Sequence, residues 1–141
     1  MTLVRFSSIA TLAAAAILSA AMVTPAQAAP AKAKAPKAVA IKGDPVHGKA
    51  VFDQCKVCHS LDAGKNGVGP SLKGIVGTKA AEVPGFTFSP AMQKSGLVWT
   101  PATLSDFLTA PMKKVPGTKM PFAGLSDPKD RDDVIAYLAK N

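Results

Sequence analysis

The two cysteines of this 141-residue chain lie three positions apart, in the stretch FDQCKVCHSL, and a histidine follows the second directly. Two thiols at this spacing can add across the two vinyl groups of a haem and form thioethers. The adjacent imidazole can then bind the iron as its proximal ligand. The motif therefore predicts one haem, attached covalently through Cys55 and Cys58 and ligated by His59.

Three other chemistries of paired cysteines remain open at this point. A thiol–disulfide oxidoreductase uses C-x-x-C within a βαβ setting, for which the sequence shows no strand pattern. A zinc site needs a fourth ligand, and His47 is the only other histidine. A structural disulfide suits an exported protein but gives His59 no role.

A second axial ligand is needed for a low-spin electron carrier, and a thioether is a soft donor that raises the reduction potential. Of five methionines, Met1 and Met22 belong to the apolar N-terminus. Met92 and Met112 lie near expected helices or turns and can be ordinary packing residues. Met120 lies in VPGTKMPFAG, where prolines and glycines favour a loop that can direct one side chain inward. Met120 is therefore the candidate distal ligand.

The first 28 residues have the features of an export signal. Arg5 precedes an apolar run over residues 7–23, and Ala26-Gln27-Ala28 has the pattern of a cleavage site. We expect cleavage after Ala28. The alternative is retention as an anchor, although the apolar run is shorter than the roughly 20 residues that a bilayer requires. Residues 29–42 contain only Ala, Pro, Lys, Val and Ile, and we expect a flexible basic tail.

A single folded domain is expected over residues 43–141. Removal of residues 1–28 lowers the formal net charge only from +8 to +7, which favours acidic partners or anionic surfaces. No nucleic-acid-binding motif is evident, and we do not expect the protein to bind nucleic acid. With six phenylalanines, one tryptophan and one tyrosine, the side-chain core is small, and a large bound apolar group would enlarge it.

Three segments carry helix signals. In the first two a capping residue is followed by proline, and in the third a capping residue precedes acids in the first turns. The caps are Asp44, Thr100, and either Ser126 or Asp127. Pro111 is expected to end the second helix. Helical spacing predicts these inward-facing residues: Val46, Ala50, Val51, Gln54 and Cys55; Leu104, Phe107 and Leu108; and Val134, Ile135 and Leu138.

Residues 60–98 between these segments are rich in glycine and proline. Only a short helix over residues 71–75 is expected there, and no strand. A stretch of this length without regular structure is unusual in a compact domain. It becomes reasonable if the loops wrap around a ligand.

Across residues 43–141 the sequence resembles the class I c-type cytochromes, close to the group of mitochondrial cytochrome c and bacterial cytochrome c2. The resemblance rests on GKAVFDQCKVCHS, GVGPSLKGIVG, GFTFSPAMQKSGLVW, LSDFLTAPMKKVPGTKMPFAG and RDDVIAYLAK. It implies an all-α cytochrome c fold, with three main helices, a short helix and long loops wrapped around a covalently bound haem c.

The resemblance also implies roles for single residues. Met120 would be the distal ligand, opposite His59. Pro70 matches a proline whose carbonyl accepts the free N–H of the proximal histidine, which fixes the imidazole and strengthens its donation to iron. Trp99 matches a tryptophan whose indole N–H bonds a haem propionate, although it can also be a plain core residue.

Gly48 and Phe52 match the place where the first helix of the family crosses the last, against Tyr137 and Leu138. A glycine within a helix costs roughly 1 kcal/mol relative to alanine. Close approach of the two backbones would explain why a glycine occupies this position.

Four positions depart from the family pattern. Phe88 and Phe107 stand where many relatives have tyrosine, Met92 where asparagine is common, and Thr78 where arginine is frequent. Surroundings that are more apolar and poorer in hydrogen-bond donors should alter the reduction potential. The sign is open, because lower polarity raises the potential whereas a lost hydrogen bond can shift it either way.

Together these features predict an exported, soluble electron carrier of the bacterial periplasm, monomeric and not an enzyme, with no membrane insertion after signal cleavage. Its expected partners are acidic redox proteins such as an oxidase, a reductase complex, a reaction centre or a dehydrogenase. One alternative is a haem peroxidase or gas sensor with a labile sixth ligand; another is the haem subunit of a dehydrogenase or oxidase assembly. Candidate partner-docking residues are Lys56, Lys65, Lys113, Lys114 and Lys119.

Overall fold

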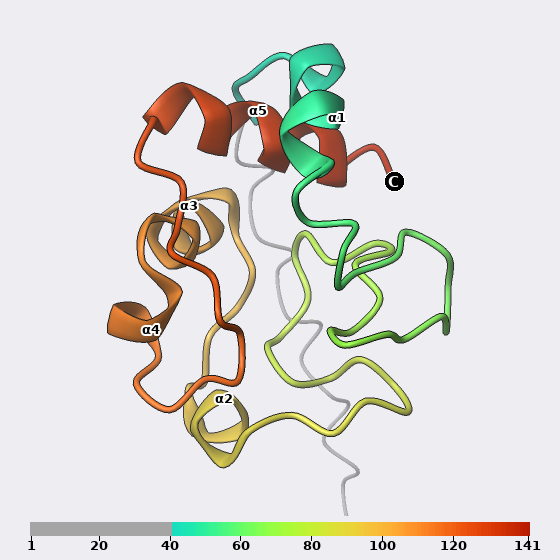
Figure 1. The fold of residues 1–141 in the computed structure, drawn as a ribbon, viewed down its shortest axis with the longest axis vertical. Helices are drawn as coiled ribbons and strands as arrows, with labels where there is room; N and C mark the ends of the chain where they lie inside the picture. Colours follow the sequence, from blue (N-terminus) through green and yellow to red (C-terminus); the bar gives the residue numbers. More distant parts are fainter. Residues whose placement is uncertain (1–40) are drawn as a thin grey trace, which may run out of the picture. The chain divides into compact units, whose positions relative to one another are not determined.

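The computed structural model describes residues 41–141, and five helices and the loops between them make up this part of the chain (Figure 1). The expected export signal, and the tail up to residue 40, lie outside the described residues. In residues 41–141 no strand forms beyond one isolated bridge between Lys79 and Val98, which confirms the all-α prediction. The helices are α1 (Pro45–Phe52), α2 (Pro90–Lys94), α3 (Pro101–Thr109), α4 (Pro111–Lys114) and α5 (Pro128–Leu138).

Each helix begins with a proline, and the three longer helices also have the expected side-chain caps. The side chain of Asp44 accepts the backbone N–H of Val46, and Thr100 caps α3 in the same way. Of the two candidates for the last helix, Asp127 is the cap. Proline needs no hydrogen-bond partner at the first helical position, and its fixed φ suits the helix, so these starts are determined locally.

Two short helices were not expected, and one expected helix does not form. Residues 71–75 make turns instead of a helix, whereas α2 and α4 appear after Ser89 and Ala110. Pro111, expected only to end the second helix, begins α4, and α3 already ends at Thr109. Helices of five and four residues are too short to show an apolar period, so pattern reading cannot find them.

The inward face of α1 differs from the prediction. Val46 is 80% exposed, and Ala50 and Gln54 are also exposed, whereas Gly48, Val51 and Phe52 are buried. These three lie at i, i+3 and i+4 and therefore form one stripe. This face of α1 points inward because Gly48, and not a residue with an apolar side chain, makes the contact with α5. The predicted inner residues of α3 and α5 are all buried, as expected.

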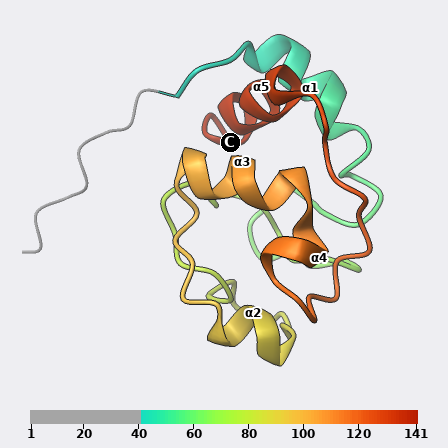
Figure 2. The same cartoon turned by 90° about the vertical axis from the view of Figure 1, so that its left-hand side faces the viewer.

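Helices α1 and α5 cross at one end of the described domain, as the resemblance implied (Figures 1 and 2). A Cβ built on Gly48 would lie 2.5 Å from the backbone carbon of Asp133 and 3.0 Å from the Cβ of Tyr137. The rings of Phe52 and Tyr137 pack beside this point, with centroids 5.5 Å apart. Only a glycine allows the two helices to come this close.

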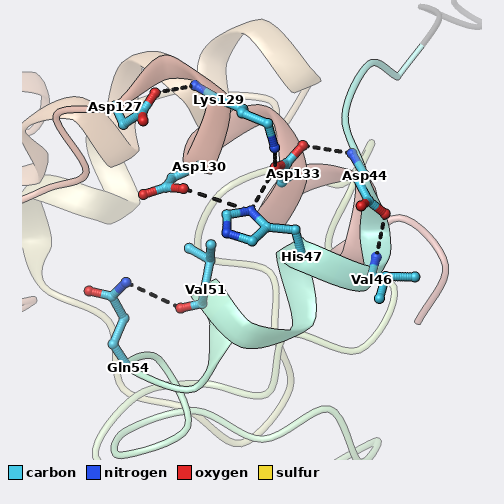
Figure 3. Close-up of polar contacts among 9 residues, drawn as sticks. All are labelled: Asp44, Val46, His47, Val51, Gln54, Asp127, Lys129, Asp130 and Asp133. Carbon is cyan, nitrogen blue, oxygen red and sulfur yellow. Dashed lines mark hydrogen bonds and ion pairs between the residues drawn. The ribbon is translucent and has the colours of Figure 1, made fainter.

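A buried carboxylate joins the start of α1 to α5 (Figure 3). The Asp133 side chain is 2% exposed, and its Oδ1 accepts the backbone N–H of Asp44 at 2.6 Å. Its Oδ2 lies 2.8 Å from Nδ1 of His47 and also accepts from Nζ of Lys129. Hydrogen bonds from Lys129 first, and then from Asp44, lower the pKa of Asp133 to about 2 and outweigh the opposite effect of burial.

Helix α3 packs against α5 and, on its other side, contacts α4 (Figure 2). Helix α2 lies at the end of the described domain away from the α1–α5 crossing in both views (Figures 1 and 2). The loops over residues 53–89 run between these two ends. In the part of the chain that the structure describes, no helix is both long and apolar enough to cross a bilayer.

Candidate cofactor site

A cavity of about 350 Å³ lies between the helices and the loops, a size in the usual range for small-molecule sites. Its walls come from the end of α1 and the turn after it, from α2, α3 and α5, from the loops over residues 68–89, from Trp99 and from residues 118–122. Most of the lining residues are aliphatic or aromatic. The long irregular stretch therefore encloses a cavity, as expected of loops that wrap around a ligand.

Cys55, Cys58 and His59 all line this cavity, from the turns that directly follow α1. The backbone N–H of Cys55 donates to the carbonyl of Phe52 at 2.8 Å, which continues the winding of the helix. The N–H groups of Cys58 and His59 both donate to the carbonyl of Cys55, at 3.1 and 2.9 Å. Winding of this kind brings residues at i, i+3 and i+4 to one side. The spacing of the motif therefore places the side chains of Cys55, Cys58 and His59 on the side that borders the cavity.

Burial, and secondly the neighbouring Cys58, raise the pKa of the Cys55 thiol to about 11. Both sulfur atoms are free and half-buried, so no disulfide joins them. Two free cysteines that line one apolar cavity are available to form thioethers with the two vinyl groups of a haem.

The imidazole of His59 is held from behind by the loop over residues 66–72. Its Nδ1 lies 2.7 Å from the carbonyl oxygen of Pro70, and because a carbonyl can only accept, Nδ1 carries the proton. Burial lowers the pKa of His59 and outweighs the opposite effect of the Pro70 bond. The ring is therefore neutral, and its Nε2 is left with the lone pair that a metal ligand needs.

Gly69 packs directly against the same ring, and its backbone N–H donates to the carbonyl of Cys58 at 2.8 Å. A Cβ at this position would lie 2.7 Å from Nδ1 of His59. Sequence reasoning did not single out Gly69, although it directly precedes Pro70. The only available signal was a glycine beside a residue already expected to contact the histidine.

Met120 also lines the cavity, and its loop is closed by a turn in which the N–H of Thr118 donates to the carbonyl of Val115 at 3.0 Å. Gly117 has a φ of +88° within this turn, which explains the glycine. A thioether and a neutral imidazole thus border one apolar space.

The aromatic residues singled out from the sequence also border the cavity. Trp99 is 7% exposed and its ring centroid lies 5.1 Å from that of Phe107. Phe88 and Met92 line the cavity as well, whereas Thr78 does not; its hydroxyl donates to the carbonyl of Ile75. The cavity wall is therefore apolar at three of the four positions that depart from the family pattern.

The five candidate lysines are placed differently. Lys119 lines the cavity. Lys56, Lys65 and Lys114 form surface ion pairs with Asp53, Asp62 and Asp106. Surface pairs of this kind contribute little energy and leave the ammonium groups accessible. Lys113 is exposed on α4.

The zinc alternative has no support in the described residues. His47 does not border the cavity and instead contacts Asp133 in the α1–α5 crossing. Within residues 41–141, no three His, Cys, Asp or Glu side chains come together as a metal site. The donors that do meet around the apolar cavity are two thiols, one neutral imidazole and the thioethers of Met92 and Met120, and this set fits a covalently attached haem.

Comparison with known proteins gives a consistent result. The sequence profile of the family described as Cytochrome c matches residues 45–141. Cytochrome c2 of Rhodomicrobium vannielii is 55% identical over 97 residues, which are 68% of this chain and 78% of that protein. Cytochrome c2 of Rhodoblastus acidophilus is 52% identical over 98 residues, 69% of this chain and 92% of that protein. The solved structure of cytochrome cH from Methylobacterium extorquens is 55% identical, covers 70% of this chain and all of its own, and superposes with a TM-score of 0.67.

Proposed function

The chain belongs to the cytochrome c family of electron carriers, and we propose that it carries single electrons in the bacterial periplasm. Members of this family have one covalently attached haem c, and we propose His59 and Met120 as the ligands of its iron. The observation that carries the proposal is the shared cavity of Cys55, Cys58, His59 and Met120. When bound, the haem supplies an iron that takes up and releases one electron between its ferrous and ferric states.

The residues of the chain have separate tasks in this proposal. Cys55 and Cys58 hold the haem through thioethers, so the cofactor is not lost during encounters with partners. His59 presents Nε2 because its Nδ1 proton is engaged by Pro70. Met120 offers a soft, neutral sulfur that favours the reduced state. If His59 and Met120 both hold the iron, small molecules would be kept from it, which would distinguish a carrier from a peroxidase or a gas sensor.

The apolar wall has a further role. Phe107 and Trp99 are buried at the cavity and keep water from the cofactor. An environment that changes little between two oxidation states lowers the reorganisation that accompanies each electron transfer. Trp99 is also proposed to donate its indole N–H to a haem propionate. We propose acidic redox proteins as partners, which would meet the basic surface that includes Lys119.

The test is spectroscopic and uses the purified holoprotein. Wild type is expected to be low-spin in both oxidation states and to show the far-red ferric absorption band of sulfur ligation. Met120→Ala should lose this band, become high-spin and gain peroxidase activity. Met112→Ala is the matched control, because Met112 is 59% exposed on α4. A high-spin wild type, or a Met120→Ala protein with unchanged spectra, would contradict the proposed ligation and favour the peroxidase or sensor alternative.

Co-purification separates the carrier from the third candidate, a haem subunit of a larger assembly. A free carrier should be recovered from the periplasmic fraction on its own. Recovery at fixed stoichiometry with a dehydrogenase or oxidase would favour the assembly.

A further inference from the structure

Asn66 connects two loops through both ends of its side-chain amide. Its Oδ1 accepts the backbone N–H of Ser71 at 2.9 Å, and its Nδ2 donates to the carbonyl of Pro84 at 3.0 Å. A backbone N–H can only donate and a carbonyl can only accept, so the orientation of the amide is determined by its two partners. Turning the amide over would lose both hydrogen bonds.

The N–H that donates to Asn66 belongs to the same peptide group that holds His59. The N–H of Ser71 and the C=O of Pro70 are the two ends of one peptide bond, which is trans, as are all those described. The same C=O accepts the Nδ1 proton of His59 at 2.7 Å. In a planar trans peptide the N–H and C=O point in opposite directions, so hydrogen bonds at its two ends are aligned.

The result is a chain of three hydrogen bonds that all run in one direction. His59 donates to the Pro70–Ser71 peptide, this peptide donates to the Asn66 amide, and the amide donates to Pro84. An amide that donates at its N–H becomes a better acceptor at its C=O, because aligned hydrogen bonds polarise one another. Asn66 therefore makes the Pro70 carbonyl a stronger acceptor for the proton of His59.

We propose that Asn66 is a positioning residue of the haem site, which strengthens the His59–Pro70 hydrogen bond and thereby lowers the reduction potential. This inference rests on the proposed function of His59 as an iron ligand. A stronger hydrogen bond at Nδ1 increases the electron density at Nε2, and a more basic imidazole favours the higher oxidation state.

The surroundings of the Pro70–Ser71 peptide favour the Asn66 side chain over water as the hydrogen-bond partner of the Ser71 N–H. Ser71 is 4% exposed, which leaves little space for a water molecule at its N–H. The hydroxyl of Ser71 donates to the carbonyl of Asp62 at 2.7 Å and holds the loop independently of Asn66. The support of the loop and the polarisation of the peptide are thus made by different atoms, which permits a matched control.

Two substitutions of Asn66 separate its donor from its acceptor. Asn66→Ala removes both hydrogen bonds. Asn66→Asp retains an acceptor for Ser71, now a charged and stronger one, and loses only the bond to Pro84. Ser71→Ala is the control, because it removes the hydroxyl bond to Asp62 and keeps the backbone N–H on which the relay depends.

Three quantities are measured on each holoprotein: the reduction potential, the NMR shift of the His59 Nδ1 proton in the reduced state, and hydrogen exchange at the Ser71 amide. In Asn66→Ala the potential should rise, the Nδ1 proton should move upfield, and the Ser71 amide should exchange about fivefold faster. In Asn66→Asp the potential should equal that of wild type or lie below it. Ser71→Ala should lower the melting temperature and leave the potential and the Nδ1 proton unchanged.

The proposal is overturned if Asn66→Ala leaves the potential and the Nδ1 proton unchanged, or if Asn66→Asp or Ser71→Ala raises the potential as far as Asn66→Ala does. If Asn66→Ala does not fold with haem, the reduction potentials of Asn66→Asp and Ser71→Ala are each compared with that of wild type. A rise of the potential in either variant would contradict the proposal. Failure of the proposed function appears elsewhere, as a wild-type protein without low-spin spectra. The Ser71 exchange measurement does not depend on Met120 and reports on the relay in either case.

Discussion

The backbone of Gly69 lies against the ring of His59, so closely that a Cβ at residue 69 would come within 2.7 Å of Nδ1 and 2.8 Å of Nε2. Gly69 is buried, and its N–H is bonded to the carbonyl of Cys58, so the loop cannot withdraw without losing this bond. The ring is thus held in contact with the backbone on one side and bonded to Pro70 at its edge.

Gly69→Ala should therefore displace His59. We expect weakened axial ligation, seen as a high-spin component in the ferric absorption spectrum, together with a loss of about 3 kcal/mol or more from overpacking of a buried site. Gly64→Ala is the control in the same loop, since its new Cβ meets no atom within 4 Å and only the φ of +72° is unfavourable. The control should lose about 1 kcal/mol and keep its spectrum. A Gly69→Ala protein with normal spectra would contradict the contact.

At the crossing of α1 and α5, helix propensity and packing predict opposite results for Gly48→Ala. Propensity alone predicts a gain of about 1 kcal/mol, because alanine is the better helix former. Packing predicts a loss of several kcal/mol, because the new Cβ would lie 2.5 Å from the backbone carbon of Asp133. Denaturant unfolding of the holoprotein decides between them. Lys49→Ala, at an exposed neighbouring position of α1, should change the unfolding free energy little.

Asp133→Asn should lower the stability at neutral pH, because an amide cannot accept hydrogen bonds from Asp44, His47 and Lys129 as a carboxylate does. The pKa of Asp133 is lowered from 3.8 to about 2, with the Lys129 bond as the largest cause. A lowered pKa means that its contribution is complete above pH 4 and is lost as the pH falls toward about 2.

The difference in unfolding free energy between wild type and Asp133→Asn should therefore be constant near neutral pH and shrink between about pH 4 and about pH 2. Asp106→Asn, which breaks an exposed pair with Lys114, serves as the control and should show little difference at any pH. A difference for Asp133→Asn that persists unchanged to pH 2 would show that the lost interaction does not depend on charge.

Lys119→Glu should slow the oxidation of the reduced protein by hexacyanoferrate(III), an anionic oxidant, by severalfold at low ionic strength. Lys119 lines the cavity, so its charge acts where the oxidant must approach. The effect should fade as salt is added, because the Debye length is about 10 Å at 0.1 M. Lys140→Glu makes the same change of net charge at an exposed position after α5. Equal slowing by both variants in stopped-flow measurements would mean that only net charge matters.

Features of short sequence range were predictable. The spacing of Cys55, Cys58 and His59 identified haem attachment, because attachment requires two thiols and a ligand within one turn. The starts of α1, α3 and α5 followed from a cap and a proline, which act within a few residues. Met120 was already a candidate ligand because of its proline- and glycine-rich loop, and the family resemblance supported it. Pro70 was found only through the resemblance, since a single proline has no distinctive chemistry in isolation.

Features that depend on close approach were not predictable from hydrophobic spacing. Spacing placed Val46 inward, and only the family resemblance placed Gly48 at the contact with the last helix, where the structure has it. Asp133 was one of several acids at the start of the last helix, and nothing in its spacing indicated burial. Asn66 stands alone between residues of no special pattern, and its partners lie 5 and 18 positions further along the chain.

The sequence by itself therefore determined the covalent chemistry, the family and the local helix starts, because each depends on neighbouring residues. Only the tertiary structure decided which face of α1 is buried, how Gly69 and Pro70 constrain His59, and that the Asn66 amide continues the hydrogen bonds of that histidine. These relations join atoms of separate loops and helices. They exist only when the backbone is folded, because residue types and local spacing do not specify which distant segments come close together.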